Sequence, residues 1–201
     1  MASEARSLII ELDAAVGRAS NSWRSELLRR VTDLLVGDIE KYSDHQIAIF
    51  GDIMSRLIEN AETPALVELS ARLARLDRVP MNVITSLARN DDMAVAGPIL
   101  EFSGMLSYDT LVDIAMTKWP NQLAAVAGRE GLTETITDLL IERGNADVMH
   151  KLISNHSARI SEVGFVRLIG QAKTDKTIAA AIATRTDLPL ELTPFLKLTL
   201  S

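Results

Sequence analysis

The sequence predicts an all-α fold: a right-handed α-solenoid of two-helix repeats, preceded by a helical N-terminal part that lies outside the repeats. A pattern recurs from Val79 onward, consisting of an apolar residue, a helix-starting residue and an apolar residue seven positions after the starter. It occurs as Val79-Pro80…Leu87, Leu106-Ser107…Ile114, Leu132-Thr133…Leu140, Ile160-Ser161…Leu168 and Leu188-Pro189…Leu196. The starts are 27, 26, 28 and 28 residues apart. A fixed period of this size is typical of stacked units that share one core.

Composition gives the second observation. Aromatic residues make up only 4% of the chain, while Ala and Leu dominate, and this balance favours helix over strand. No stretch of alternating apolar and polar residues has a length comparable to the helical patterns. Both observations agree with the period in predicting helices only.

Four helices are predicted before the repeats. The second follows an Asn21-Ser22 cap, the third begins at a Ser43/Gln46 capping box, and the fourth opens at Thr63-Pro64. Their apolar stripes, from the first helix to the fourth, are Leu8, Leu12, Ala15 and Val16; Trp23, Leu27, Leu28, Val31, Leu34 and Leu35; Ile47, Phe50, Ile53, Met54, Leu57 and Ile58; and Leu66, Leu69, Leu73 and Leu76.

Each repeat is predicted to hold two helices. The first helix starts at Pro80, Ser107, Thr133, Ser161 or Pro189, where the side chain accepts hydrogen bonds from free N–H groups or the residue lacks an N–H. A polar break and a second helix follow, and Gly104 and Gly131 are predicted left-handed caps after two of the second helices. A hairpin this small cannot bury its own apolar face, so it must stack on its neighbours.

The repeats are predicted to occupy residues 79–201 as about four and a half units, with residues 1–78 as an N-terminal segment packed on them in one continuous domain. The fifth unit has only its first helix and finishes with apolar residues. Solenoids normally finish with a polar face. The interpretations left open are a missing continuation, the boundary of an excised fragment, a surface covered by another subunit, or a last helix that folds back as a lid.

Charge and cysteine content narrow the classes of function. The formal net charge of −6 opposes tight non-specific binding to nucleic acid or to an anionic membrane. Without Cys, disulfides, thiolate metal sites and cysteine nucleophiles are excluded. The N-terminal sequence does not match a signal peptide, and no window approaches the apolar length of a membrane span. These features lead us to expect a cytoplasmic protein.

Two segments carry a resemblance to known repeats: Leu106-Ser-Tyr-Asp-Thr-Leu-Val-Asp-Ile-Ala115 and Ile160-Ser-Glu-Val-Gly-Phe-Val-Arg-Leu-Ile169. They resemble HEAT-like and leucine-rich-variant helical repeats. Together with the Tyr42-Ser43-Asp44…Ile47-Ala48-Ile49-Phe50 block, the chain resembles, over roughly residues 25–200, a bacterial domain family of unknown function built on such repeats. The resemblance implies a cytoplasmic bacterial protein and offers no catalytic motif.

No known catalytic or ligand-binding motif is present. His150 and His156 are six residues apart, a spacing that does not place two ligands on one helical face. The sequence contains no zinc-protease, calcium-loop, phosphate-loop or serine-elbow motif. We therefore predict a protein that is not an enzyme and that has no cofactor or metal site, although acid–base pairs can assemble from distant helices.

Four residues are candidates for binding a partner. Arg129, Asn155 and Arg185 fall at matching places near the ends of consecutive second helices, where stacking would align them along one edge. The alternative is that they complement the negative ends of helices. Trp119 lies in a break between helices, directly before Pro120. It is either an exposed interface anchor or an apolar staple over the helix start.

Three functions follow as hypotheses. The first is a non-enzymatic scaffold whose helical-repeat groove binds a protein or peptide through its second helices. The alternative is a nucleic-acid-binding repeat protein with a local basic patch, formed by Arg24, Arg29, Arg30, Arg72, Arg75 and Arg78. Interspersed acidic residues argue against that patch. The third is self-association through the N-terminal helices and the apolar C-terminal helix.

Overall fold

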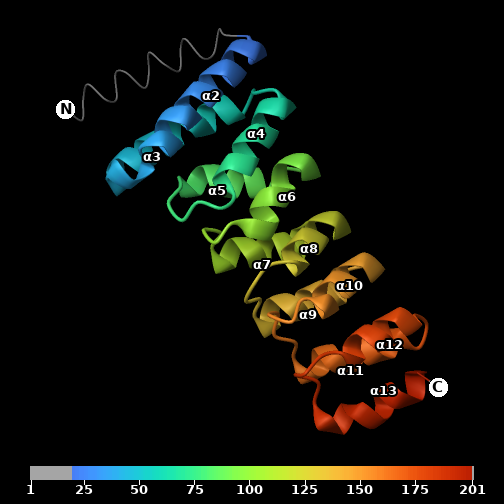
Figure 1. The fold of residues 1–201 in the computed structure, drawn as a ribbon. Helices are drawn as coiled ribbons and strands as arrows, with labels where there is room; N and C mark the ends of the chain where they lie inside the picture. The colour runs from blue at the N-terminus through green and yellow to red at the C-terminus, as the bar shows by residue number, and fades with distance from the viewer. Residues whose placement is uncertain (1–19, 201) are drawn as a thin grey trace. The chain divides into compact units, whose positions relative to one another are not determined.

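The computed structural model describes residues 20–200, which contain helices and connecting loops and no strand (Figure 1). The predicted opening helix at Leu8–Val16 lies outside these residues. The chain divides into two compact units, Met1–Leu106 and Ser107–Ser201. The boundary predicted between residues 78 and 79 therefore falls inside the first unit. Each unit is described by itself.

The first unit contains five α-helices among its described residues. They are α2 (Asn21–Gly37), α3 (Asp44–Ile58), α4 (Thr63–Leu73), α5 (Met81–Ala88) and α6 (Met93–Phe102), with a short 3₁₀ turn, η1 (Ile39–Lys41), after α2. Helices α2, α4 and α6 contact one another in succession, and α3 contacts α5. This part of the chain therefore forms two helical layers.

The second unit has the same two-layer order. Its helices are α7 (Tyr108–Thr117), α8 (Pro120–Ala127), α9 (Glu134–Arg143), α10 (Ala146–Ser154), α11 (Glu162–Ala172), α12 (Lys176–Ala183) and α13 (Thr193–Leu200), with a 3₁₀ turn, η2 (Leu190–Leu192), before α13. Helices α7, α9, α11 and α13 contact in succession, and so do α8, α10 and α12 (Figure 1). The two helices of each predicted hairpin thus contribute to different layers.

Four of the five predicted helix starts are confirmed, while after the fifth, Pro189, a 3₁₀ turn comes first and α13 begins only at Thr193. Pro80, Ser107, Thr133, Ser161 and Pro189 are the N-cap residues of α5, α7, α9, α11 and η2. The predicted role of the side chain holds for the serines, since Ser107 accepts from the Thr110 N–H and Ser161 from the Gly164 N–H. It is wrong for Thr133, which makes no side-chain cap bond.

The apolar residue seven positions after each starter lies in the core. Leu87, Ile114, Leu140 and Leu168 are 0% exposed and Leu196 is 3% exposed. Each points from a first helix into the space between the layers, where it loses contact with water. Full burial of a side chain of this size contributes about 1.5–3 kcal/mol relative to leaving it exposed. The repeat pattern is therefore a pattern of core positions.

Helix α2 corrects two details of the prediction. Its N-cap is Ser20, whose side chain accepts from the Trp23 N–H, and the helix starts at Asn21. Its buried face is rotated from the predicted stripe, because Trp23 is 45% and Leu34 is 62% exposed. The residues buried there are Arg24, Ser25, Leu28, Thr32 and Leu35.

Two hydroxyl groups explain how polar residues replace apolar ones on this face. Ser25 Oγ donates to the Asn21 carbonyl and accepts from the Glu62 N–H, each at 2.9 Å. Thr32 Oγ1 donates to the Leu28 carbonyl at 2.7 Å. Because these groups are satisfied, the small side chains can be buried and α2 can approach α4 closely. Apolar periodicity alone does not reveal such a face.

The N-terminal part is also more repeat-like than its sequence indicates. Helices α3 and α4 contact α5 and α6 layer by layer, in the same order as successive hairpins in the second unit. The helix starters Ser43 and Pro80 are 37 residues apart, well outside the period, because α3 has 15 residues. The longer helix conceals the relationship. Of the two predicted left-handed caps, Gly131 has φ +66°, while Gly104 does not adopt a positive φ.

Gly51 in α3 allows close contact with the start of α5. An added Cβ would lie 2.8 Å from the Pro80 Cβ and would also overlap the Asn82 side chain. We predict that Gly51→Ala lowers the free energy of unfolding by about 1–3 kcal/mol, because overpacking against a buried proline outweighs the gain in helix propensity.

Gly170→Ala in α11 is the matched control, since an added Cβ there meets no neighbouring atom within 4 Å. The same substitution should raise stability by about 0.5–1 kcal/mol. Urea unfolding followed by circular dichroism measures both. Equal effects at the two glycines would contradict this account of Gly51.

Candidate functional site

Arg185 is a structural clamp inside the second unit. Its side chain is 0% exposed. Its guanidinium donates to the carbonyl oxygens of Ile153 (3.1 Å), Asn155 (2.9 Å) and Ala158 (2.7 Å) and pairs with both carboxylate oxygens of Asp187. The planar donor group of arginine suits such a cluster of acceptors. The side chain thereby ties the end of α12 to the end of α10.

Asn155 acts in the same way one repeat earlier. Its Nδ2 donates to the carbonyl oxygens of Ala127 (2.9 Å) and Arg129 (2.5 Å), at the end of α8. Its Oδ1 accepts from the N–H and hydroxyl of Ser157. The last carbonyls of a helix have no partner within the helix, so side chains from the next repeat satisfy them.

Arg129 occupies the corresponding position after α8 and is 9% exposed. Burial lowers the pKa of its guanidinium, because the charged form loses hydration. The three residues predicted to line a binding edge are thus used or buried within the fold. Arg185 has no exposed side-chain atom to offer a partner, and the helix-end interpretation describes Asn155 and Arg185 better than partner binding does.

Trp119 is the fourth predicted site residue, and its side chain is exposed. It is the N-cap residue of α8 and is 71% exposed, with Met116, 57% exposed, in the last turn of α7. The staple interpretation is therefore wrong, because a staple side chain would be covered by the helix it packs on. An exposed Trp is a residue type that anchors protein interfaces.

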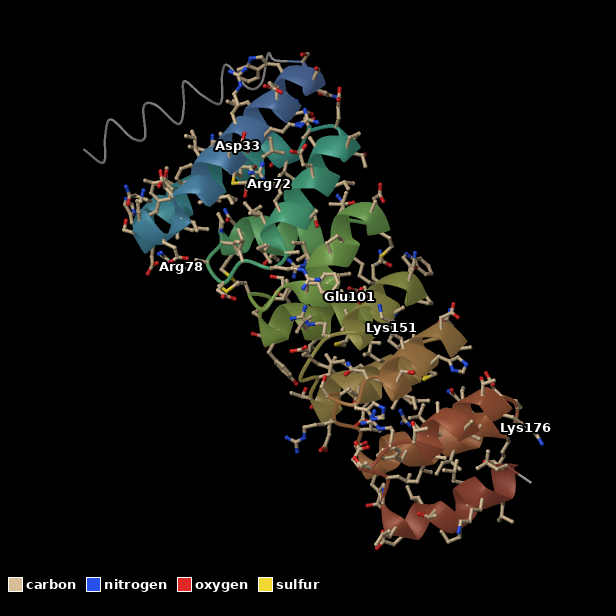
Figure 2. All side chains as sticks on the ribbon, in the orientation of Figure 1. Asp33, Arg72, Arg78, Glu101, Lys151 and Lys176 are labelled. Atoms are coloured by element: carbon tan, nitrogen blue, oxygen red, sulfur yellow. The ribbon has the colours of Figure 1, made fainter. Side chains whose placement is uncertain are left out.

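Most of the arginines proposed as a nucleic-acid patch face carboxylates or the interior, and the exposed Arg75 lies over the Phe102 ring at 3.9 Å. Arg29 pairs with Glu68 at 2.8 Å, Arg72 with Asp33 at 2.6 Å and Arg78 with Asp44 at 2.8 Å. Figure 2 shows Asp33 and Arg72 side by side, from α2 and α4. The hydrogen bond from Arg29 to Glu68 raises the pKa of Arg29. Paired cations release fewer counterions on meeting phosphates, so this surface is a poor nucleic-acid site.

One titratable cluster joins α10 to α12. His150 Nε2 lies 3.3 Å from Asp175 Oδ2 and 3.1 Å from Thr177 Oγ1. A catalytic triad would need the carboxylate at one ring nitrogen and the hydroxyl at the other. Here both partners face the same nitrogen, so the cluster does not activate the hydroxyl. In the described range, no group of three or more His, Asp or Glu residues could hold a metal ion.

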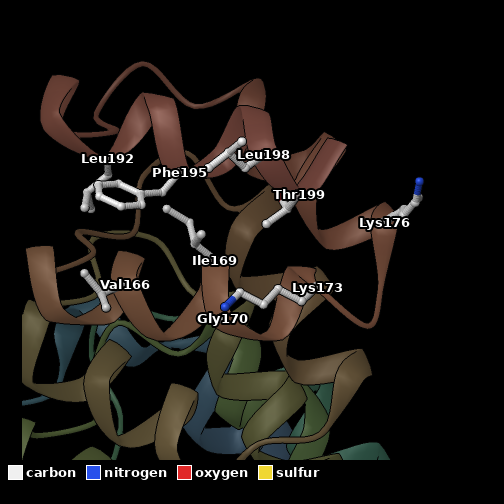
Figure 3. Close-up of a pocket in the computed structure, with 9 residues that line it drawn as sticks. All are labelled: Val166, Ile169, Gly170, Lys173, Lys176, Leu192, Phe195, Leu198 and Thr199. Carbon is white, nitrogen blue, oxygen red and sulfur yellow. The ribbon is translucent and has the colours of Figure 1, made fainter. Parts of the chain in front are cut away.

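The largest cavity among those described is a cleft between α11 and α13, which sequence reasoning did not predict. We call it the α11–α13 cleft. Its volume is about 710 Å³, within the range of natural ligand pockets. Figure 3 shows that α11 and α13 provide facing walls. The lining residues are Val166, Ile169, Gly170, Lys173, Lys176, Leu192, Phe195, Leu198 and Thr199.

The walls of the cleft are apolar and unusually exposed. Val166 is 53%, Phe195 58% and Leu198 75% exposed. Val163 at the start of α11 and Leu190 in η2 are also exposed, at 60% and 84%. Soluble surfaces rarely keep so many large apolar side chains together unless another molecule covers them.

Gly170 indicates that the open space of the α11–α13 cleft has a functional reason. It lies inside α11, where glycine weakens a helix by roughly 0.5–1 kcal/mol relative to alanine. Its φ is not positive, and an added Cβ would meet no neighbouring atom within 4 Å. Neither backbone conformation nor packing within residues 20–200 requires glycine here. A glycine at such a position leaves room for another molecule to approach the backbone.

Two smaller depressions lie in the first unit. One, of about 610 Å³, is lined by polar residues of α5 and the loop after it. The other, of about 440 Å³, is lined by apolar residues such as Ile47 and Val79 together with three aspartates and Arg78. Neither combines apolar walls with an unexplained glycine, so the α11–α13 cleft is the stronger site.

Comparison with known proteins identifies a family. The sequence model of a family described as "Uncharacterised protein conserved in bacteria (DUF2336)" matches residues 95–196. The chain belongs to this family. The matched region includes Trp119 and most of the cleft lining. It is shorter than the resemblance over residues 25–200, and it does not reach Leu198 or Thr199. No curated protein and no solved structure shows a significant match.

No helix within residues 20–200 combines the length and apolar character needed to cross a membrane. The sequence did contain a signal for the cleft, since a glycine inside a strongly helical segment calls for a packing or functional reason. The apolar residues of α13 were recognised as unpartnered, but their pairing with α11 depends on the tertiary fold.

The clamp formed by Arg185 leads to a stability prediction. Arg185→Met should lower the free energy of unfolding by about 3–5 kcal/mol, because it leaves three carbonyls and a carboxylate without their donor. Arg167→Met is the control: its pair with Glu142, at 3.6 Å, is exposed, and its loss should cost less than about 1 kcal/mol. Chemical denaturation measures both. If Arg185→Met lowered the free energy of unfolding no more than Arg167→Met does, the hydrogen bonds of Arg185 would not stabilise the fold as proposed.

Asp175 leads to a prediction about pH. Hydrogen bonds from the hydroxyl and N–H of Thr177, with a smaller effect of His150, lower the pKa of Asp175. A carboxyl group whose pKa is lower in the folded state stabilises the fold above its unfolded value of about 3.9. That stability is lost as pH falls through the folded value.

Asp175→Asn keeps a capping oxygen but removes this titration. The difference in Tm between wild type and Asp175→Asn should therefore shrink as the pH falls from about 5.5 to about 3. Thermal unfolding across that range measures it. A difference that stays constant would show that the charge of Asp175 contributes nothing.

Proposed function

We propose that this protein is a non-enzymatic interaction module of the bacterial cytoplasm, and that the α11–α13 cleft binds a segment of a partner protein. We further propose that its hairpins form a right-handed, HEAT-like α-solenoid. The cleft is the observation that carries the proposal. An apolar groove between two helices, in which Val166, Phe195 and Leu198 are more than half exposed, has the character of a surface that a partner covers.

The position of the site differs from the one expected on the second helices. The cleft is formed mainly by α11 and α13, which are the first helices of their repeats, and α12 contributes Lys176. The first helices support a site here because Val166 and Gly170 of α11 and Phe195 of α13 are exposed. Trp119 and Met116 offer a second anchor for the same partner, because an exposed aromatic next to a flexible Met suits protein recognition.

Filling the cleft tests this proposal. In Gly170→Leu, the added Cβ would meet no neighbouring atom within 4 Å, so we expect the fold to be preserved and the larger side chain to block binding. Gly37→Leu, at the end of α2, is the matched control, since that glycine also has no neighbouring atom within 4 Å of an added Cβ.

A phage-displayed library of random peptides should be panned against the wild type. The recovered peptides should bind wild type and Gly37→Leu equally and Gly170→Leu at least about 10-fold more weakly, a loss of about 1.4 kcal/mol. Circular dichroism and Tm control for folding. Peptides that bind all three proteins equally, or a library that yields no binder, would refute the cleft as the binding site.

A further inference from the structure

We infer, on the basis of the proposed function, that the occupant of the α11–α13 cleft is an amphipathic α-helix of a partner protein with carboxylate side chains next to its apolar anchors. The inference rests on the hydrogen-bonding capacity of the cleft and on the charge at one of its ends.

The first argument concerns the backbone of the occupant. A peptide that enters an apolar cleft loses water from its N–H and C=O groups, and these groups need new partners. Thr199 carries the only hydroxyl among the lining residues, and it already donates to the Leu196 carbonyl at 2.7 Å. The described residues contain no strand edge that could pair with an extended chain.

A helix avoids this cost, because it satisfies its backbone groups internally. It can place apolar side chains at i, i+3, i+4 and i+7 into a groove between two other helices. Gly170 removes a side chain from the floor, which lets an approaching helix come closer to α11. The shape and the polarity of the cleft therefore both favour a helical occupant over an extended one.

The second argument concerns charge. Lys173 and Lys176 are the only charged residues that line the cleft, although the chain as a whole carries a net charge of −6. In Figure 3 the Lys173 side chain extends beside Gly170, while Lys176 lies beyond Thr199 with its ammonium group directed away from the cleft. Neither lysine makes an ion pair within residues 20–200.

The fold itself accounts for only one of these lysines. Lys173 is the C-cap residue of α11, where a cation complements the negative end of the helix. Lys176 is the first residue of α12, at the positive end of that helix, where a cation is unfavourable. Carboxylates on the occupant, one near each lysine, would complement these charges and would fix the direction in which the helix lies.

A second copy of this chain is a less suitable occupant. A two-fold contact would bring the same patch against itself. The cleft of each copy would then present two lysines and no carboxylate from its lining to the other. Self-association through α13 thus lacks the charge complement that an acidic helix supplies.

Three synthetic peptides of about 16 residues, a length at which a helix can form, test the inference. All carry leucines at i, i+3, i+4 and i+7. The first has glutamates and the second has lysines beside the leucines, and the third is the glutamate peptide with a central proline that breaks the helix. Fluorescence polarisation measures their binding to wild type, to Lys173→Glu/Lys176→Glu and to Gly170→Leu.

The glutamate peptide should bind wild type about 3- to 30-fold more tightly than the lysine peptide, the range expected for two exposed ion pairs. The double variant should reverse this preference, and the proline peptide should bind more weakly than either. Higher salt should reduce the preference, because exposed charges are screened.

The outcomes separate the two proposals. Equal binding of the glutamate and lysine peptides, with a loss in Gly170→Leu, would overturn the acidic partner and keep the cleft as a binding site. Undiminished binding of the proline peptide would overturn the helical occupant alone. Binding that Gly170→Leu does not reduce, or no binding of any peptide, would overturn the cleft itself. A concentration-dependent dimer of wild type in sedimentation, abolished by Gly170→Leu, would show a second copy as the occupant.

Discussion

The helices of the second unit are short, and the fold depends on how they bury one another. They have 8 to 11 residues, below the length at which an isolated helix is stable in water. Stability must therefore come from apolar residues such as Ile114, Leu140 and Leu168, which each first helix buries against its neighbours. No hairpin can be removed without exposing the core faces of the next.

The same constraint assigns roles to polar residues at the ends of the second helices. A short helix has a large share of unpaired terminal carbonyls. Asn155 and Arg185 bind these carbonyls from the following repeat, and the serine and aspartate caps satisfy the opposite ends. Polar side chains that resemble a binding edge in the sequence are thus part of the internal hydrogen-bonding of the unit.

At α13, the last helix of the described residues, side chains of α11 and α13 remain exposed, and a binding site can form between them. Leu196 is buried in the core, while Phe195 and Leu198 face the cleft. The glycine at position 170 keeps that space open at a cost in helix stability. The proposed partner helix would contribute what the fold lacks at this place, namely an apolar face for α11 and α13 and carboxylates for Lys173 and Lys176.

The sequence by itself determined the helical class, the starts of the repeat helices and the core position in each first helix. These follow from local rules, since capping and the spacing of apolar residues act within one helix. It also identified Trp119 as an exceptional residue without deciding its exposure. The tertiary structure alone decided the rotated face of α2, the fate of Arg129, Asn155 and Arg185, and the existence of the cleft. Each of these depends on which surfaces meet across residues distant in the chain. A pattern along one helix cannot show whether a carbonyl or open water faces a given side chain.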